Sequence, residues 1–110
     1  MEVKKIKVKG DPYSAYVQII STIFSLTPLE QKVTAELLRR YEELLLEASI
    51  NIANEVLFST RVSKEIRDKL SLKEATYNNI KSSLIKKNIV INNSLNTNIR
   101  LTELHFTYEV

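Results

Sequence analysis

The sequence predicts a single α+β domain that is mostly helical, with an N-terminal strand and a small antiparallel hairpin. Three observations predict this class: an N-terminal stretch with alternating apolar residues, apolar residues at helical spacing through the middle, and β-prone runs around an asparagine-rich segment near the end. A chain of 110 residues with 44% hydrophobic residues suffices for one core. We therefore expect one domain over residues 1–110, with the strand and supporting helices in residues 1–57 and the remaining elements in residues 58–104.

The N-terminal part is expected to form a strand followed by a helix. Apolar residues alternate with lysines in residues 3–9, which is the period-two pattern of a half-buried strand. Asp11 and Pro12 then supply an N-cap and a first-turn proline. Apolar residues recur from there at helical spacing, so this pattern predicts a helix as far as about Ser25.

A second helix start is expected at Thr27, where the sequence T-P-L-E forms a capping box. The threonine oxygen can accept a hydrogen bond from the amide of Glu30, and the carboxylate of Glu30 can accept one from the amide of Thr27. An apolar stripe then continues for five turns, to about Ala48, and residues 51–59 keep a weaker helical pattern. We expect residues 12–46 to form the hydrophobic support of the domain or a dimer surface.

Two further helices are expected with an abrupt restart between them. Apolar residues four positions apart predict a helix over residues 60–70. Ser71 and Glu74 then form a second capping box, which predicts a new helix one residue after the previous one ends. Asn88 tolerates the left-handed conformation of a helix C-cap and is expected to end it. This restart is what a helix-turn-helix requires.

The last part of the chain is expected to form a hairpin. The β-prone residues 89–91 are followed by a polar, asparagine-rich run at 92–98 and by a second β-prone run at 99–101. Two such runs around a turn predict an antiparallel pair. We expect the N-terminal strand to pair with this hairpin or with the β-rich C-terminal tail.

Charge is unevenly distributed along the chain. The net charge of +3 is modest, but residues 75–102 contain no Asp or Glu. The cations in that stretch are Lys81, Lys86, Lys87 and Arg100. Residues 29–47 mix more acids than bases. One surface is therefore expected to be basic, which favours a nucleic-acid partner, and another to be acidic.

The order of helix, tight turn, lysine-ended helix and hairpin resembles winged helix-turn-helix proteins, as found in bacterial and phage regulators and plasmid replication initiators. The resemblance covers about residues 58–104 and is carried by the segments VSKEI (62–66), KEATYNNI (73–80) and LIKKNIV (84–90). The family usually has glycine where this chain has Ser71 and Asn88. Serine can instead cap the next helix, and asparagine can adopt a positive φ.

The resemblance implies binding to duplex DNA, with the second helix of the motif in the major groove. The base-facing candidates that it implies are Lys73, Thr76, Asn78 and Asn79. Asparagine suits adenine and lysine suits guanine. The phosphate candidates are Lys81, Lys86, Lys87 and Arg100. The expected function is sequence-directed regulation of transcription or replication in a phage or mobile element, with duplex DNA and a second copy of the chain as partners.

A second interpretation stays open, because winged helices also serve as protein-protein interaction modules. The chain would then be a structural module in a larger replication, packaging or virion assembly. The net charge of only +3 favours this alternative, since dedicated DNA binders often carry more. A helix face rich in lysine and asparagine is also typical of any solvated face in a protein from an AT-biased genome.

No catalytic, metal or cofactor site is expected, so the chain is not expected to be an enzyme. The sequence has no cysteine, and His105 has no second imidazole with which to share a metal. Gly10 is the only glycine, which excludes glycine-rich phosphate loops. Glu42 and Glu43 point to different faces of a solvated helix and form no carboxylate dyad. The aromatic residues on the apolar stripes are expected in the core: Tyr13, Tyr16 and Tyr41.

The sequence also indicates where the chain resides. Its longest apolar runs, such as those at residues 44–46 and 89–91, are far shorter than the roughly 18 residues needed to span a bilayer. The N-terminal stretch lacks the hydrophobic region of a signal peptide. We therefore expect a cytoplasmic protein without membrane contact, in a bacterial host cell if a phage or mobile element encodes it.

Overall fold

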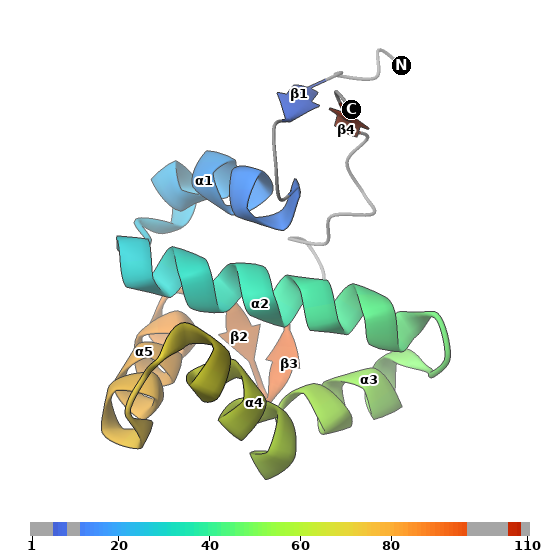
Figure 1. Ribbon diagram of the computed structural model, residues 1–110, viewed down its shortest axis with the longest axis vertical. Helices are drawn as coiled ribbons and strands as arrows, with labels where there is room; N and C mark the ends of the chain where they lie inside the picture. Colours follow the sequence, from blue (N-terminus) through green and yellow to red (C-terminus); the bar gives the residue numbers. More distant parts are fainter. Residues whose placement is uncertain (1–5, 9–11, 97–105, 109–110) are drawn as a thin grey trace.

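The computed structural model describes residues 6–8, 12–96 and 106–108, most of which are helical (Figure 1). The helices are α1 (Pro12–Phe24), α2 (Pro28–Leu45), α3 (Ile50–Leu57), α4 (Thr60–Leu70) and α5 (Glu74–Lys86). The antiparallel hairpin consists of β2 (Val90–Ile91) and β3 (Ser94–Leu95). A separate parallel pair consists of β1 (Ile6–Val8) and β4 (Phe106–Tyr108).

The predicted α+β class is wrong. None of the described strands exceeds three residues, and the two strand pairs do not join into one sheet. The N-terminal strand predicted in residues 3–9 was expected to pair with the hairpin or with the C-terminal tail, and among the described residues it does not join the hairpin. Only Ile6–Val8 are described as a strand there, and they pair with Phe106–Tyr108 as a separate two-stranded unit. The fold is therefore a helical globule with one short antiparallel hairpin.

The hairpin is shorter than predicted because two residues are enough to close it. Asn92 and Asn93 both have positive φ, at 51° and 56°, as a two-residue type I′ turn requires. Val90 therefore pairs with Leu95, inside the run that the sequence pattern assigned to one long turn. The predicted second strand, at residues 99–101, lies outside the described residues.

α2 is the central helix. Figure 1 shows it across the middle of the molecule, with α1 on one side and α3, α4 and α5 on the other. Its predicted capping box is confirmed: the amide of Glu30 donates to Oγ1 of Thr27 at 3.3 Å, and the amide of Thr27 donates to Oε1 of Glu30 at 2.8 Å. α2 ends at Leu45, earlier than predicted, and Ser49 caps α3 through a hydrogen bond from the amide of Ile52.

The buried apolar residues form one cluster that takes members from α1 through β3. The largest fully buried side chains are Val17, Val33, Leu37, Leu38, Tyr41, Leu57, Ile66, Leu84, Ile89, Val90 and Leu95. Tyr16 and Tyr41 lie in this core as predicted, and Tyr13 packs against its edge. The supporting helices and the hairpin therefore share one core. None of the helices among the described residues is long and apolar enough to cross a membrane.

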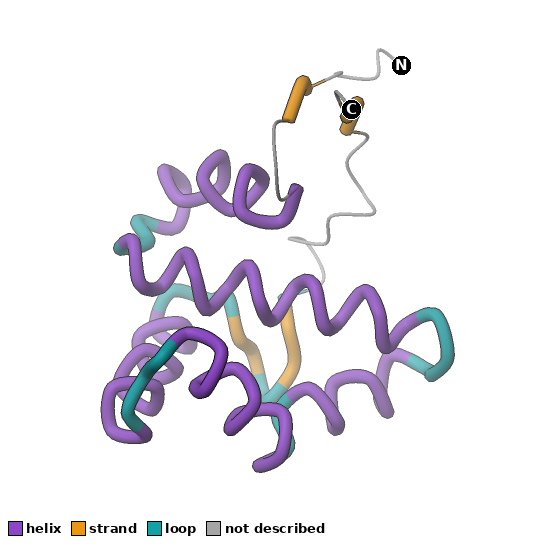
Figure 2. Tube along the Cα trace, in the orientation of Figure 1, coloured by secondary structure: helices purple, strands orange, loops and turns teal. Residues whose placement is uncertain are grey.

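The hairpin lies between α5 and α3 (Figure 2). Asn54, a buried polar residue of α3, attaches it: its Oδ1 accepts a hydrogen bond from the amide of Leu95 at 3.0 Å. The Nδ2 atom of the same side chain donates to the carbonyl of Ile50 at 3.0 Å. The buried side-chain amide of Asn54 thus supplies a hydrogen-bond partner both to a backbone N–H group of the strand and to a backbone carbonyl of the helix.

Candidate nucleic-acid interface

α4 and α5 are joined by three residues, in a way that differs from the prediction. Ser71 ends α4 in the left-handed conformation (φ 57°, ψ 43°), and the amide of Leu72 donates to the carbonyl of Arg67 at 2.8 Å. Lys73 is the N-cap of α5 and makes no side-chain capping bond. The predicted capping box from Ser71 to Glu74 is therefore wrong. Ser71 instead occupies the helix-ending position where glycine is most common.

The inner face of α5 holds this helix to the core. Tyr77, Ile80 and Leu84 recur three and four positions apart, and all three are buried. Burial raises the pKa of the Tyr77 phenol, while a hydrogen bond with Ser63 opposes part of that rise. Since Ser63 belongs to α4, Tyr77 ties the two helices together.

The opposite face of α5 carries mostly small and polar side chains, with Ile85, 48% exposed, as the apolar exception beside them. We call one stripe of it the outward row; it consists of Ala75, Asn79, Ser82 and Lys86, all exposed. Their spacing of three and four places them on one line along the helix. No acidic residue occurs after Glu74 in this helix or in the hairpin that follows it. Glu74 itself is exposed at the start of α5.

The four predicted base-facing residues do not share one face of α5. Lys73 is exposed and precedes the first turn, and Asn79 belongs to the outward row. Asn78 is exposed on the flank that faces α4, where it lines a cleft. Thr76 is half-buried and, by helical spacing, lies on the other flank. Asn79 is thus the candidate nearest the centre of the exposed face.

A cleft of about 210 Å³ lies between α4 and α5. Within it, the ammonium of Lys81 lies 5.3 Å from the centre of the Phe58 ring, and the guanidinium of Arg67 lies 3.7 Å from the carboxylate of Glu74. The cleft is smaller than the roughly 300 Å³ at which small-molecule pockets begin. It therefore places Arg67 beside Lys81, with the exposed Glu74 as the ion-pair partner of Arg67, and forms no ligand pocket. Sequence reasoning missed Arg67 because it lies before the acid-free stretch and next to Asp68.

The predicted phosphate candidates differ in their surroundings. Lys86 is exposed, at the end of the outward row. Lys81 is half-buried, and its ammonium lies over the Phe58 ring. Arg100 lies outside the described residues. Lys86 is therefore the freest of the predicted cations in the part of the chain that the structure describes, since the remaining one, Lys87, has an internal partner.

Lys87 is bound inside the molecule. Its ammonium lies 2.5 Å from Oε1 of Glu30 and 2.8 Å from the carbonyl of Ser25. Glu30 also accepts hydrogen bonds from the amide of Thr27 and the hydroxyl of Ser83. Burial by itself raises the pKa of Glu30, but these hydrogen bonds outweigh it and lower the pKa to about 2. The carboxylate is therefore charged at neutral pH and holds Lys87 away from an external anion.

The buried carboxylates of α2 form no catalytic pair. Glu36 is buried and pairs with Arg39 and, at 2.9 Å, with Lys69 of α4. Glu42 is buried, with 9% of its surface exposed, whereas Glu43 is exposed. The two residues do point to different faces, but the prediction that the helix is solvated at both positions is wrong for Glu42, because α2 packs against neighbours on more than one side.

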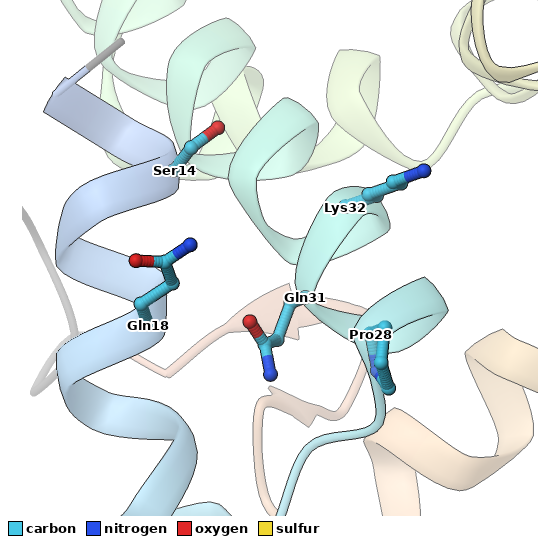
Figure 3. A pocket seen from close by; sticks show the side chains of 5 residues that line it. All are labelled: Ser14, Gln18, Pro28, Gln31 and Lys32. Atoms are coloured by element: carbon cyan, nitrogen blue, oxygen red, sulfur yellow. The ribbon is translucent and has the colours of Figure 1, made fainter. Parts of the chain in front are cut away.

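A second depression lies between α1 and α2 (Figure 3). Its volume is about 250 Å³, and its lining residues are Ser14, Gln18, Pro28, Gln31 and Lys32. Among the described residues that line it, the side chains offer a hydroxyl, amides and one ammonium, but no carboxylate or imidazole for acid-base chemistry. Among the residues that the structure describes, no group of three acidic, histidine or cysteine side chains could hold a metal ion. His105 and Gly10 lie outside these residues.

The comparisons with known proteins supply no relative from which a role could be transferred. The resemblance of residues 58–104 to winged helix-turn-helix proteins therefore stays a prediction from the sequence. No family model, curated protein or solved structure matches this chain.

Proposed function

We propose that the chain binds duplex DNA through α5, as a small regulator of transcription or replication in a phage or mobile element. The observation that carries the proposal is the outward row, which is polar or small throughout and ends in Lys86. At 1.5 Å per residue, the row from Ala75 to Lys86 is about 16 Å long, which suits a helix lying in the major groove. This function also locates the protein in the cytoplasm of a bacterial host.

The side chains of the outward row suit contact with base edges. Ala75 and Ser82 are small, so the backbone of α5 can come close to the groove floor. Asn79 lies between them, and its amide can donate to and accept from adenine at the same time. Lys73 and Asn78 would reach bases on either side of this contact, and Thr76 would contribute only from its half-buried position.

Cations beside the outward row would hold the phosphates. Lys86 is exposed, and Lys81 and Arg67 line the cleft on the α4 side. Arg100 enters the proposal on the sequence alone. Lys87 is left out because Glu30 binds its ammonium. Phosphate contacts fix the register of a protein on the duplex, whereas base contacts supply the sequence preference.

Selection from a random-sequence duplex pool, followed by anisotropy titrations at two salt concentrations, tests the proposal. The protein should bind selected duplexes more tightly than scrambled ones. Asn79→Ala should lose about 1–3 kcal/mol of discrimination at a single base pair. Asn51→Ala is the matched control, since Asn51 is an exposed amide on α3. Equal effects of the two substitutions would contradict the assignment of α5 as the reading helix.

A second candidate function is an interaction module within a larger assembly. Two apolar side chains favour it: Leu46 and Ile23 are 85% and 76% exposed, and neither lies on α5. Both side chains are available for contact with a partner protein, and binding of DNA by α5 would leave them exposed. If no duplex binds below about 100 μM, where even non-specific association is expected, this second function replaces the first.

A further inference from the structure

A third hollow, distinct from the α4–α5 cleft and from the depression between α1 and α2, is a cleft of about 390 Å³. It opens where α2 ends, between α2, α3 and α4. Its floor is apolar and includes Leu44, Val56 and Val62. Leu46 follows α2 as its C-cap and also lines this cleft. With 85% of its surface exposed, Leu46 is the most exposed large apolar residue in the described part of the chain. An apolar floor and an exposed leucine therefore lie side by side on one surface.

The rim of this cleft carries charges of both signs. Arg61 on α4, and Glu43 and Glu47 near the end of α2, are exposed and line the cleft. None of the three forms an ion pair with another described residue, whereas their neighbours Arg40 and Glu65 pair at 2.7 Å. A rim of one sign would repel a second copy of itself. A rim with unpaired charges of both signs is complementary to its own copy.

We propose that this surface binds a second copy of the chain in a symmetric contact, with Leu46 of each copy entering the cleft of the other. Because every contact in such an interface occurs twice, Arg61 of each copy meets Glu43 or Glu47 of the other. The leucine buries its exposed surface against the apolar floor, and the charged rim fixes the orientation of the two copies. The interface thus covers Leu46 and gives partners to all three unpaired charges.

This contact leaves the outward row of α5 uncovered. Leu46 lies at the C-terminal end of α2. The Lys87–Glu30 ion pair instead holds the end of α5 against the N-terminal end of α2. An 18-residue helix separates these ends by about 27 Å. Figure 1 shows the turn after α2 at the opposite end of that helix from α5. A dimer formed here therefore presents two separate copies of the outward row, and its formation does not depend on DNA binding.

Sedimentation velocity of the full chain, measured over a wide range of protein concentration, tests this interface. The protein should form a dimer, and Leu46→Ser should raise its dissociation constant by about tenfold or more. Ile23→Ser is the matched control, because it removes a similarly exposed apolar side chain from α1. Both positions are exposed, so both variants should fold, which circular dichroism checks. A protein that stays monomeric, or a dimer that Leu46→Ser leaves unchanged, overturns the proposal.

Reversal of the rim charges tests whether these residues contact the second copy. Arg61→Glu makes the three rim charges acidic, and the double substitution of Glu43→Lys with Glu47→Lys makes them basic. Each variant alone should be monomeric because it repels its own copy, and an equal mixture of the two should form a heterodimer. A mixture that stays monomeric overturns the proposal. So does an Arg61→Glu variant that only loses thermal stability, which would show that Arg61 pairs within its own chain.

Discussion

The ammonium of Lys87 lies 2.5 Å from Oε1 of Glu30, and this ion pair joins the end of α5 to the first turn of α2. Glu30 is also the third residue of the α2 capping box, so one carboxylate caps a helix and holds a second helix in place. The orientation of α5, and with it the direction of the outward row, therefore depends on a buried group 57 positions away in the sequence.

Replacing Glu30 should change both stability and its pH dependence. The folded-state pKa of about 2 lies below the ordinary value of 4.5, so the unfolded chain takes up the proton first as pH falls. This carboxylate therefore stabilises the fold above pH 4.5, by about 3 kcal/mol, and loses that contribution as pH falls to about 2.

Urea unfolding at a series of pH values measures this effect. Glu30→Gln should be less stable than the wild type at neutral pH by about 3 kcal/mol, and its stability should change less between pH 4.5 and about 2. Glu55→Gln, at an exposed position on α3, serves as the control and should behave like the wild type. Identical pH profiles for Glu30→Gln and the wild type would contradict the network.

Lys86 and Lys87 are adjacent but should behave differently. Lys86→Gln should leave stability unchanged and flatten the dependence of log K on log salt for duplex binding by about 0.9, the contribution of one phosphate contact. Lys87→Gln should keep the salt dependence and lose about 1–3 kcal/mol of stability, because it leaves the buried Glu30 without its cation. The reverse pattern in paired titrations and unfolding curves would mean that Lys87 contacts DNA.

Replacing Ser71 with glycine should stabilise the fold. Ser71 adopts φ 57°, a conformation that costs a residue with a side chain about 1 kcal/mol relative to glycine. Ser71→Gly should therefore raise the free energy of unfolding by about that amount. Ser82→Gly, inside α5 and exposed, should lower it by about 0.5 kcal/mol. Thermal unfolding of the two variants compares them directly, and a loss of stability in both would count against the left-handed turn.

Asn54 should control the attachment of the hairpin. Asn54→Ala leaves the buried amide of Leu95 without its acceptor, which should cost about 1–3 kcal/mol. Amide hydrogen exchange should accelerate at Leu95 more than in α2. Asn51→Ala, at an exposed position on the same helix, should change neither quantity by a comparable amount. Uniform acceleration throughout the chain would indicate a global rather than a local effect.

The features that depend on neighbours in the sequence could be predicted, and those that depend on tertiary contacts could not. The capping box at Thr27 was predictable because its two hydrogen bonds join residues three positions apart. Ser71 offers the same local pattern, yet it ends α4, because the path of the chain between two helices that both pack on α2 requires a left-handed residue there. Asn92 and Asn93 were predictable as turn residues, but composition did not reveal that two residues suffice.

In the candidate site, too, some features follow from the local sequence and others depend on tertiary contacts. Helical spacing predicts that Asn79 and Lys86 lie on the exposed face of α5. It cannot reveal that Lys87 is held by Glu30, or that Arg67 joins Lys81 in one cleft, because both depend on how α5 lies against α2 and α4. The burial of Glu42 was hidden for a related reason, since α2 is in contact with helices on several sides.

Amide chemical-shift mapping of the labelled protein during titration with its selected duplex tests the central claim most directly. We predict saturable shifts that are largest along the outward row, at Ala75, Asn79, Ser82 and Lys86, and small shifts at Leu46 and Ile23. No saturable shift at duplex concentrations up to about 100 μM, or shifts confined to the surfaces around Leu46 and Ile23, would contradict DNA binding by α5.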